Sequence, residues 1–190
     1  MTRVFVLLVC FFLVIGLGEE LVQNGDFENS LSHWEVDYNN NMGSWQARVD
    51  TSYHPDSDHE VYVYKYDRHY AKIRQTVDLP STDAPILFST SAKLYSRKIS
   101  GSNYYAYATL TLLYLNSAGS SMGKTMIVHK TPLCNLQNTP EQHIIEAVST
   151  GWEYYTFNIW DELANLPGVN APEVAKIRIE LEGHCTSQGG

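Results

Sequence analysis

The chain has 190 residues, and its 13 basic and 21 acidic side chains give a formal net charge of −8. This length suits one domain with a substantial core, and a hydrophobic share of 44% against 18% charged residues argues against disorder. The acidic balance provides no basic patch that could follow a phosphate backbone. Nucleic acids and anionic membrane surfaces are therefore excluded as expected partners.

The first eighteen residues have the pattern of an export signal. Arg3 precedes an uninterrupted apolar run over residues 4–15, and residues 16–18 (Gly-Leu-Gly) offer the small residues that a signal peptidase reads. A membrane-spanning helix needs about 20 apolar residues, more than this run provides, so the run favours a cleaved signal. An uncleaved membrane anchor is the alternative. The sequence predicts a secreted protein, extracellular or at a cell surface. Residues 1–18 are its signal peptide, residues 19–190 its mature domain, and no membrane segment remains after cleavage.

Cysteine usage agrees with export. After removal of the leader, Cys134 and Cys185 remain, and such a pair in an exported chain predicts a disulfide. Closing a loop of about 50 residues would stabilise the fold by roughly 4 kcal/mol. The alternative is a metal site that combines these cysteines with His129, His143 and His184, although no Cys-x-x-Cys or His-x-x-x-His spacing supports it.

Period-two alternation of apolar and polar residues recurs along the chain and predicts eight or nine β-strands. The clearest are residues 45–50, 60–66, 70–79, 85–97, 104–116, 123–130, 152–160 and 176–182. With polar turns between them and no interleaved helices, they predict an all-β fold, an antiparallel two-sheet sandwich.

One short helix is predicted in the connection after residue 130. Thr139 stands at an N-cap position, Pro140 at the first helical position and Gln142 at the third, and apolar residues follow up to 148. Residues 161–164 are a candidate for one further turn.

The most specific motif is Leu-Val-Gln-Asn-Gly-Asp-Phe-Glu at residues 21–28, with Trp34 six residues later. It resembles the opening of galactose-binding-like jelly rolls, particularly carbohydrate-binding modules of the family 4, 9, 16 and 22 type. Landmarks at 73–77, 88–94 and 151–155 agree in order, so the resemblance spans residues 21–182. It implies a β-sandwich that binds a glycan, often joined to an enzyme, with a structural calcium ion.

The chain departs from that family near its C-terminus. The family's penultimate strand is usually followed by a closing strand with an Asp-rich motif, which returns beside the first strand. Here residues 177–183 resemble the penultimate strand, and only a few residues follow. Either residues 176–182 are the last strand, or the closing strand is absent and leaves an open edge that could pair with another chain.

The resemblance places calcium ligands in the opening motif. Asp26 and Glu28 would supply oxygens, and Glu180 or Glu182 would replace the family's missing C-terminal acid if its strand lies beside the first. A structural turn at residues 24–26 is the alternative. The acidic loop at 56–60 is a second candidate metal site, for which a solvated connection is the alternative.

The glycan hypothesis depends on aromatic side chains, because the C–H faces of sugar rings pack on aromatic faces. Residues at i and i+2 lie about 7 Å apart on one strand face, a spacing that occurs twice in the chain. The predicted platform comprises Tyr62, Tyr64, Tyr66, Tyr105 and Tyr107, completed by Trp45 and Tyr95, with Arg74, Gln75 and Lys93 as donors. The alternative is that one tyrosine stripe faces the core.

Two catalytic motifs are missing: the chain has no His-Glu-x-x-His and no glycine-rich phosphate loop. Glu180 and Glu182 form a same-face carboxylate pair, but on a terminal strand beside Arg178 they favour a solvated face over a glycosidase pair. We therefore expect no enzyme activity. The sequence favours a secreted, noncatalytic carbohydrate-binding module. The alternative is a structural surface or filament subunit that self-associates, or takes a partner strand, through an open sheet edge.

Overall fold

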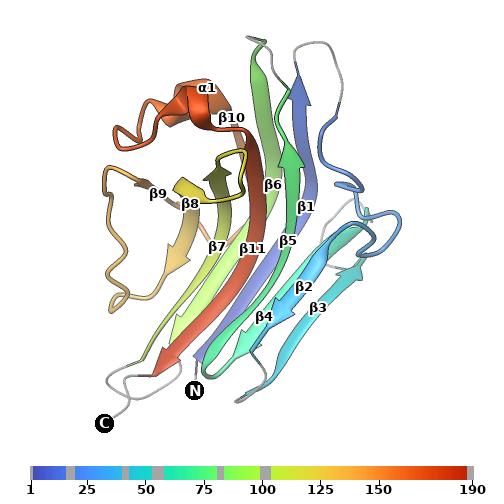
Figure 1. Cartoon of the computed structure of the whole chain (residues 1–190). Helices are drawn as coiled ribbons and strands as arrows, with labels where there is room; N and C mark the ends of the chain where they lie inside the picture. The colour runs from blue at the N-terminus through green and yellow to red at the C-terminus, as the bar shows by residue number, and fades with distance from the viewer. Residues whose placement is uncertain are drawn as a thin grey trace.

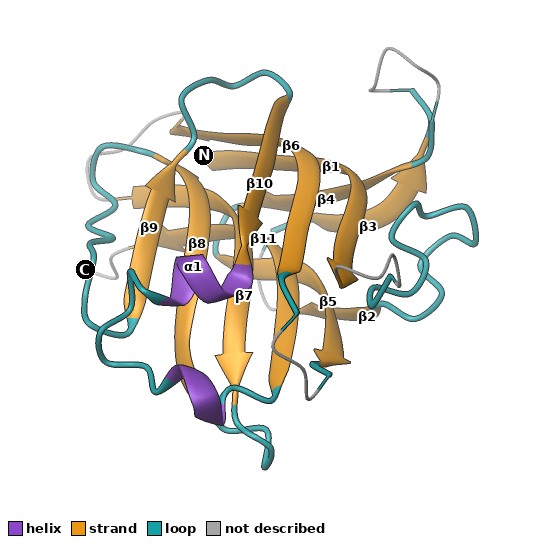
Figure 2. Ribbon diagram, turned by 90° about the horizontal axis from the view of Figure 1, so that it is seen from above, coloured by secondary structure: helices purple, strands orange, loops and turns teal. Residues whose placement is uncertain are grey.

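The computed structural model describes residues 2–15, 20–39, 43–52, 58–80, 84–98 and 104–187, with the backbone alone for residues 2–15, Lys98 and Ser187. Its strands form two sheets packed face to face, which Figures 1 and 2 show from two directions. Sheet A has the strand order β10-β6-β1-β4-β3, and sheet B has the order β2-β5-β11-β7-β8-β9. The described chain is therefore an all-β two-sheet sandwich, as the alternation predicted.

The strands of sheet A are β10 (Glu153–Asn158), β6 (Ile86–Lys98), β1 (Thr2–Ile15), β4 (Glu60–Tyr66) and β3 (Trp45–Asp50). Those of sheet B are β2 (Glu35–Tyr38), β5 (His69–Asp78), β11 (Lys176–Ser187), β7 (Tyr104–Leu115), β8 (Ser121–Lys130) and β9 (Gln142–Glu146). Among these pairs β8 and β9 run parallel, and the others run antiparallel.

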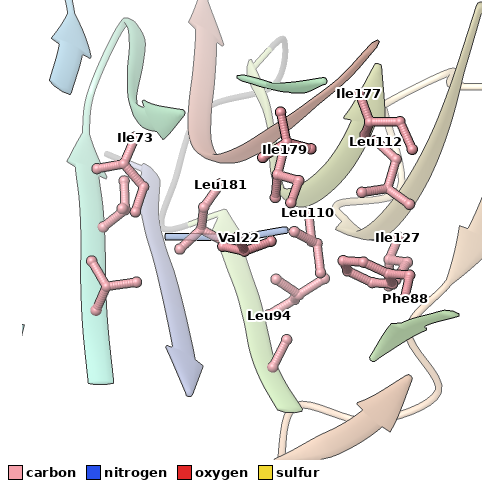
Figure 3. Close-up of a cluster of buried hydrophobic side chains, with 14 of the residues drawn as sticks. Val22, Ile73, Phe88, Leu94, Leu110, Leu112, Ile127, Ile177, Ile179 and Leu181 are labelled. Carbon is pink, nitrogen blue, oxygen red and sulfur yellow. The ribbon is translucent and has the colours of Figure 1, made fainter. Parts of the chain in front are cut away.

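The core lies between the two sheets and consists of the inward positions of the long strands. Figure 3 shows part of this cluster, in which Phe88 and Leu94 of sheet A lie among aliphatic side chains of sheet B. Leu110 and Leu112 of β7 and Ile177, Ile179 and Leu181 of β11 face it at alternate positions, as a strand with one buried side requires. Burial of these stripes fixes which face of each strand points outward.

The eight predicted strands are all present, with ends that differ by a few residues. Two short strands escaped prediction, because β2 and β9 have only four and five residues and show little alternation. The short helix α1 (Ile159–Leu163) lies where a further turn was expected, and the side chain of Asn158 accepts a hydrogen bond from the Trp160 amide as its cap. A 3-10 turn follows at Ala171–Glu173.

The helix predicted after Thr139 was wrong, because this segment leads into β9. The Thr139 hydroxyl accepts a hydrogen bond from the Glu141 amide, as at an N-cap, but the Glu141 carbonyl accepts from the Lys124 amide of β8 instead of continuing a helix. Residues 142–146 then pair with 124–128 of β8. Pairing with a strand distant in sequence has overridden a local capping pattern.

Residues 2–15, within the predicted signal peptide, form β1 in the middle of sheet A. Residues 3–9 pair with β4, and residues 2–15 pair with β6 with an irregularity between residues 9 and 11. The predicted cleavage region at residues 16–18 lies outside the described residues. No helix in the described chain is long and apolar enough to cross a membrane.

Strand β11 occupies the centre of sheet B, where it pairs with β5 on one side and β7 on the other. The segment 176–182 is thus an interior strand with both edges in use. The sheets end at β10 and β3 in sheet A and at β2 and β9 in sheet B.

Candidate functional site

The seven aromatic residues that the sequence groups into one platform lie on different faces of the sandwich. Val61 and Val63 of β4 are fully buried in the core. Because side chains alternate along a strand, the tyrosines of β4 point outward from sheet A; these are Tyr62, Tyr64 and Tyr66.

The other tyrosine pair lies on the opposite side of the molecule. Ala106 and Ala108 of β7 are fully buried in the core. Tyr105 and Tyr107, at the alternate positions, therefore point outward from sheet B. One ligand cannot contact both tyrosine groups, so the single predicted platform divides into two surfaces.

Trp45 and Tyr95 belong to the rim of the sandwich. Trp45 pairs with buried Lys65, packs against the core, and stacks on Tyr38 of sheet B with ring centroids 3.6 Å apart. Tyr95 lies on the outward side of β6, and its ring stacks on His129 of β8 at 5.9 Å. Both side chains thus bridge the two sheets at their borders.

On the outer face of sheet A, neighbouring side chains cover Tyr62. Tyr62 and Tyr64 have nearly parallel rings with centroids 6.1 Å apart, and the guanidinium carbon of Arg48 lies 5.1 Å from the centroid of Tyr62. Tyr62 is only 5% exposed. Arg48 also pairs with Asp50, at 3.1 Å, so its charge is already directed to a neighbour on β3.

On the outer face of sheet B, three rings stack across two strands. The centroids of Tyr105 and Tyr107 lie 6.5 Å apart, and the ring of His184, opposite Tyr107 on β11, lies 4.6 Å from Tyr107 with an interplanar angle of 5°. Burial raises the pKa of Tyr107 well above its ordinary value, and the nearby Glu182 carboxylate raises it further. Tyr107 therefore keeps its hydroxyl proton and can donate a hydrogen bond.

Charged side chains continue this surface across β11, β5 and β2. The ammonium nitrogen of Lys72 lies 3.4 Å from a carboxylate oxygen of Glu180, 4.0 Å from one of Asp37 and 5.2 Å from the ring centroid of Tyr70. The side chains of Lys72 and Glu180 are only 16% and 13% exposed. Half-buried charges need fixed partners, so these groups form an ordered polar surface.

The pair of Arg74 and Glu35 lies at the next position along the strands. Arg74 donates to both carboxylate oxygens of Glu35, at 2.9 and 2.6 Å. This hydrogen bonding lowers the pKa of Glu35 and raises that of Arg74. Both residues line a hollow of about 410 Å³ together with Gln23 and His33, a size within the range of small-ligand sites.

The connection from β8 to β9 borders this surface on its other side. Because β9 is parallel to β8, residues 131–141 must run back along the sheet, and the Leu136 carbonyl accepts a hydrogen bond from the outward-pointing Lys130. Met126, Val128 and Cys134 are buried but lie outside the main core cluster. The connection therefore covers the outer face of sheet B over β8 and leaves the outer face over β11, β5 and β2 uncovered.

We define the sheet B surface as Tyr70, Lys72, Arg74, Tyr105, Tyr107, Glu180, Glu182 and His184, with Glu35 and Asp37 at its margin. It combines ring faces with carboxylates, an ammonium, a guanidinium and hydroxyls. This is the set of groups that contacts polyhydroxylated ligands through C–H packing and hydrogen bonds.

Of the predicted donors, only Arg74 lies on the sheet B surface. The amide of Gln75 points inward, donating to the Gln23 carbonyl at 2.8 Å and accepting from the Gln23 amide at 2.8 Å. Lys93 occupies an outward position on β6, in sheet A. The alternation of each segment indicated these faces, but not which sheet each strand would join.

Sequence reasoning missed His184, Tyr70 and Lys72 as members of the site. The outward face of Tyr70 and Lys72 could be predicted, since residues 70–79 alternate clearly, whereas His184 lies beyond the predicted strand 176–182. Their proximity depends on pairing of β11 with both β5 and β7, which joins residues between 61 and 116 positions apart in sequence. No local pattern specifies that pairing.

The predicted calcium ligands are not brought together. Glu180 pairs with Lys72, whereas Glu28 lies 3.0 Å from the ring nitrogen of His59. In the described chain, the potential ligand atoms of Glu28, Asp58 and His59 lie within 4.8 Å of one another. One imidazole and two carboxylates are far from the six to eight oxygens that calcium takes, so this group does not fit the implied ion. Asp26, the remaining predicted ligand, accepts a hydrogen bond from the backbone amide of Glu28 at 3.3 Å. Asp56 of the acidic loop lies outside the described residues.

The opening motif instead stabilises its own loop. The Asn24 amide donates to the carbonyls of Ser30 and Ser32 at 2.9 and 3.0 Å, and the Asn24 carbonyl accepts from the indole of Trp34 at 3.1 Å. Phe27 is fully buried and its ring centroid lies 5.3 Å from that of Trp34. These contacts match the alternative reading of the motif as a structural turn.

The predicted disulfide is absent, because Cys134 and Cys185 are both buried free cysteines. Cys185 points across to sheet A, with its sulfur 3.7 Å from the Lys65 carbonyl oxygen. Cys134 lies in the turn after β8, near Tyr107 on the outer side of sheet B. The even count of cysteines could not reveal that the two lie on opposite sides of one sheet.

The described geometry gives a sandwich with one densely polar and aromatic outer face, and comparison with known proteins adds no family to it. No protein-family model matches the chain, and no curated protein matches it significantly.

Proposed function

We propose that this protein is a secreted, noncatalytic carbohydrate-binding domain of the galactose-binding-like, jelly-roll kind, which binds an oligo- or polysaccharide on the sheet B surface. The observation that supports this proposal most directly is the stack of Tyr107 and His184, with rings 4.6 Å apart, beside half-buried Glu180 and Lys72.

The physical basis is the pairing of apolar and polar groups. A pyranose ring offers C–H faces and a rim of hydroxyls, so it needs aromatic surface and fixed hydrogen-bonding groups within a few ångströms of each other. Tyr105 and Tyr107 supply ring surface, and Lys72 and Glu182 supply a donor and acceptors. Because neighbouring side chains already hold these groups in place, binding orders few of them further.

The same contacts favour binding over catalysis. Glu180 is paired with Lys72, and Glu182 lies 3.0 Å from a ring nitrogen of His184. A retaining glycosidase needs one carboxyl group held as an acid and the other left to attack, with the substrate enclosed between them. Two carboxylates engaged by cationic or imidazole partners on an open sheet face support a noncatalytic role.

A glycan array probed with the purified protein tests the proposal, with Tyr107→Ala and Tyr64→Ala as a matched pair. We expect Tyr107→Ala to weaken binding of any hit by about tenfold to a hundredfold, the size typical of a buried aromatic contact. Tyr64→Ala removes an equivalent side chain from sheet A and should leave affinity unchanged. Loss of binding in Tyr64→Ala alone would overturn the assignment to sheet B, and no hit from folded protein would overturn glycan binding.

The same array with a calcium chelator tests the implied ion. The sheet B surface draws no group from residues 24–30, so we expect glycan binding to persist in chelator. Binding that disappears with the chelator and returns with added calcium would show that the ion participates although Glu180 is paired with Lys72.

Association through an open edge is the alternative function, and while β1 is in place the described sheet margins offer it only short strands. Strands β10, β3, β2 and β9 have six, six, four and five residues. Short edge strands limit pairing with other chains.

A further inference from the structure

Two carboxylates on the outward side of β11 lie two residues apart and have different partners. Glu180 lies 3.4 Å from the ammonium nitrogen of Lys72. The side chain of Glu182 is only 16% exposed, and its Oε1 atom lies 3.0 Å from the Nδ1 atom of His184. Within the described residues, no lysine or arginine nitrogen lies within 4.0 Å of the Glu182 carboxylate. Glu182 is therefore a half-buried carboxylate to which the described chain brings no permanent cation.

Lys72 shows how this face of the sheet holds an ammonium group. Its nitrogen lies 3.4 Å from the Glu180 carboxylate and 5.2 Å from the centroid of the Tyr70 ring. The carboxylate supplies the opposite charge, and the ring attracts the cation through its electron-rich face. Lys72 is also the ladder partner of Glu182. Its ammonium nevertheless points to Glu180 and, at 4.0 Å, to Asp37.

The same two kinds of partner, a carboxylate and tyrosine rings, also meet around Glu182. The His184 ring that contacts Glu182 stacks on Tyr107, with centroids 4.6 Å apart. The Tyr105 ring follows, with its centroid 6.5 Å from that of Tyr107. Burial raises the pKa of Tyr107 and the Glu182 carboxylate raises it further, because the two side chains are close. The partners that hold the Lys72 ammonium are thus repeated here without a lysine.

The charges of the sheet B surface favour a cationic ligand over an anionic one. The surface and its margin hold four carboxylates and two cations, which belong to Glu35, Asp37, Glu180, Glu182, Lys72 and Arg74. The whole chain has a formal net charge of −8. A glycan with uronate or sulfate groups would therefore be repelled from this surface, whereas ammonium groups would be attracted to it.

We propose that Glu182, Tyr107 and Tyr105 form a subsite for an ammonium group, and that the glycan bound on the sheet B surface carries free amino groups, as a chain of glucosamine units does. This inference rests on the proposed glycan binding and adds the class of sugar. An amino sugar carries its ammonium directly on the pyranose ring. One unit can therefore pack C–H groups on an aromatic ring and place its cation beside the Glu182 carboxylate. A lysine side chain has the cation but offers neither the pyranose face nor its hydroxyls.

Three tetrasaccharides with the same β-1,4 linkage, titrated into the full chain in a calorimeter at pH 7, test this assignment. They consist of glucosamine, N-acetylglucosamine and glucose, so they differ only in the group at carbon 2. We expect the glucosamine tetramer to bind at least about tenfold more tightly than the other two. A glucosamine tetramer with trimethylated nitrogens, which stay charged at every pH, should share this advantage.

Two variants that each remove one negative charge form the matched control. Glu182→Gln keeps the size of the side chain and an oxygen for His184, and should bring the glucosamine tetramer to within about threefold of the glucose tetramer. Asp78 is 81% exposed and lies opposite Lys176, about 20 Å along the strands from Glu182. Asp78→Asn removes the same charge and should leave the preference for glucosamine intact. Thermal unfolding verifies that both variants are folded.

Several outcomes would overturn the inference. Equal binding of the glucosamine and glucose tetramers would overturn the ammonium subsite and leave glycan binding standing. Loss of the preference in both variants would mean that net charge, and not Glu182, attracts the amine. Tetralysine that binds the parent as tightly as the glucosamine tetramer does, and fails to bind Glu182→Gln, would assign the subsite to a peptide.

The failure of the inference and the failure of the proposed function give different results. If none of the tetramers binds while another glycan on the array does, the amino-sugar class is wrong and carbohydrate binding stands. If the folded protein binds neither the tetramers nor any glycan on the array, the proposed function is overturned together with the inference.

Discussion

The two outer faces of this sandwich carry nearly the same tyrosine motif in different surroundings. Tyr62 and Tyr64 have centroids 6.1 Å apart on sheet A, and Tyr105 and Tyr107 have centroids 6.5 Å apart on sheet B. On sheet A, the neighbour across the ladder is Arg48, which covers Tyr62. On sheet B, the neighbouring strands β11 and β5 add an imidazole ring and a network of half-buried charges.

The difference teaches that aromatic spacing within one strand does not define a binding surface. The side chains opposite each ring determine whether the ring is covered or offered to a ligand. Tyr107 faces His184 and adjoins Glu182, so polar groups lie beside an aromatic stack. Removal of matched residues from the two faces should therefore have unequal effects.

The largest expected difference between the two faces concerns the effect on stability of replacing one lysine on each, Lys72 on sheet B and Lys93 on sheet A. Lys72→Met removes the cation from Glu180 and Asp37 and leaves two partly buried carboxylates without it. We expect a loss of about 1–2 kcal/mol in the free energy of unfolding. Lys93→Met on sheet A should change it by less than about 0.5 kcal/mol. Urea denaturation at pH 7 measures both, and equal losses would remove the distinction between the faces.

A smaller effect is expected for the arginine that covers Tyr62. Arg48→Ala removes a cation–π contact and an exposed ion pair with Asp50, which together contribute about 1 kcal/mol or less. It should also expose the Tyr62 ring, so that Tyr62 becomes accessible to nitration. Arg97→Ala, an exposed change on the same sheet, is the control and should leave Tyr62 unreactive; nitration of Tyr62 in both variants would argue against the covering role.

The smallest effect concerns the pH dependence of the sheet B margin. Hydrogen bonding to Arg74 holds the pKa of Glu35 below its ordinary value of 4.5. A lowered folded-state pKa stabilises the fold above that ordinary value, and this contribution is lost as the pH falls through the folded value. Glu35→Gln should therefore lose less stability than the parent between pH 5 and pH 3, measured by thermal unfolding. Parallel curves would show that the pair contributes nothing.

Much of the fold was predictable because alternation records burial directly. Residues 60–66 and 176–182 were assigned to strands with correctly opposed faces, since one side of each strand contacts the core. The helix after Thr139 was mispredicted for the converse reason: a capping pattern is local, whereas Lys124 of β8 offers a backbone partner from outside the window. The small strand β9 exists through that pairing.

The candidate site was predictable only in part. The alternation of inward and outward residues shows which side chains share a face of one strand, but not which strands are neighbours in the sheet. Tyr107 was named as a sugar contact, but Glu180 was assigned to a calcium site and His184 only to the alternative cysteine–histidine metal site. Both assignments depend on where β11 lies, and its position between β5 and β7 is a property of the whole sheet. The separation of Cys134 from Cys185 was hidden in the same way.

The central position of β11 also constrains how this protein folds. Its ten rungs with β5 join residues 176–185 to 69–78, so the ladder closes only after a long intervening segment has been made. Until β11 emerges from the ribosome, β2 and β5 remain apart from β7, β8 and β9. Contacts between residues so far apart in sequence favour slow folding, and sheet B can form completely only after β11 has been synthesised. A chain interrupted before residue 176 would hold two exposed half-sheets, which makes incomplete products of synthesis prone to aggregate.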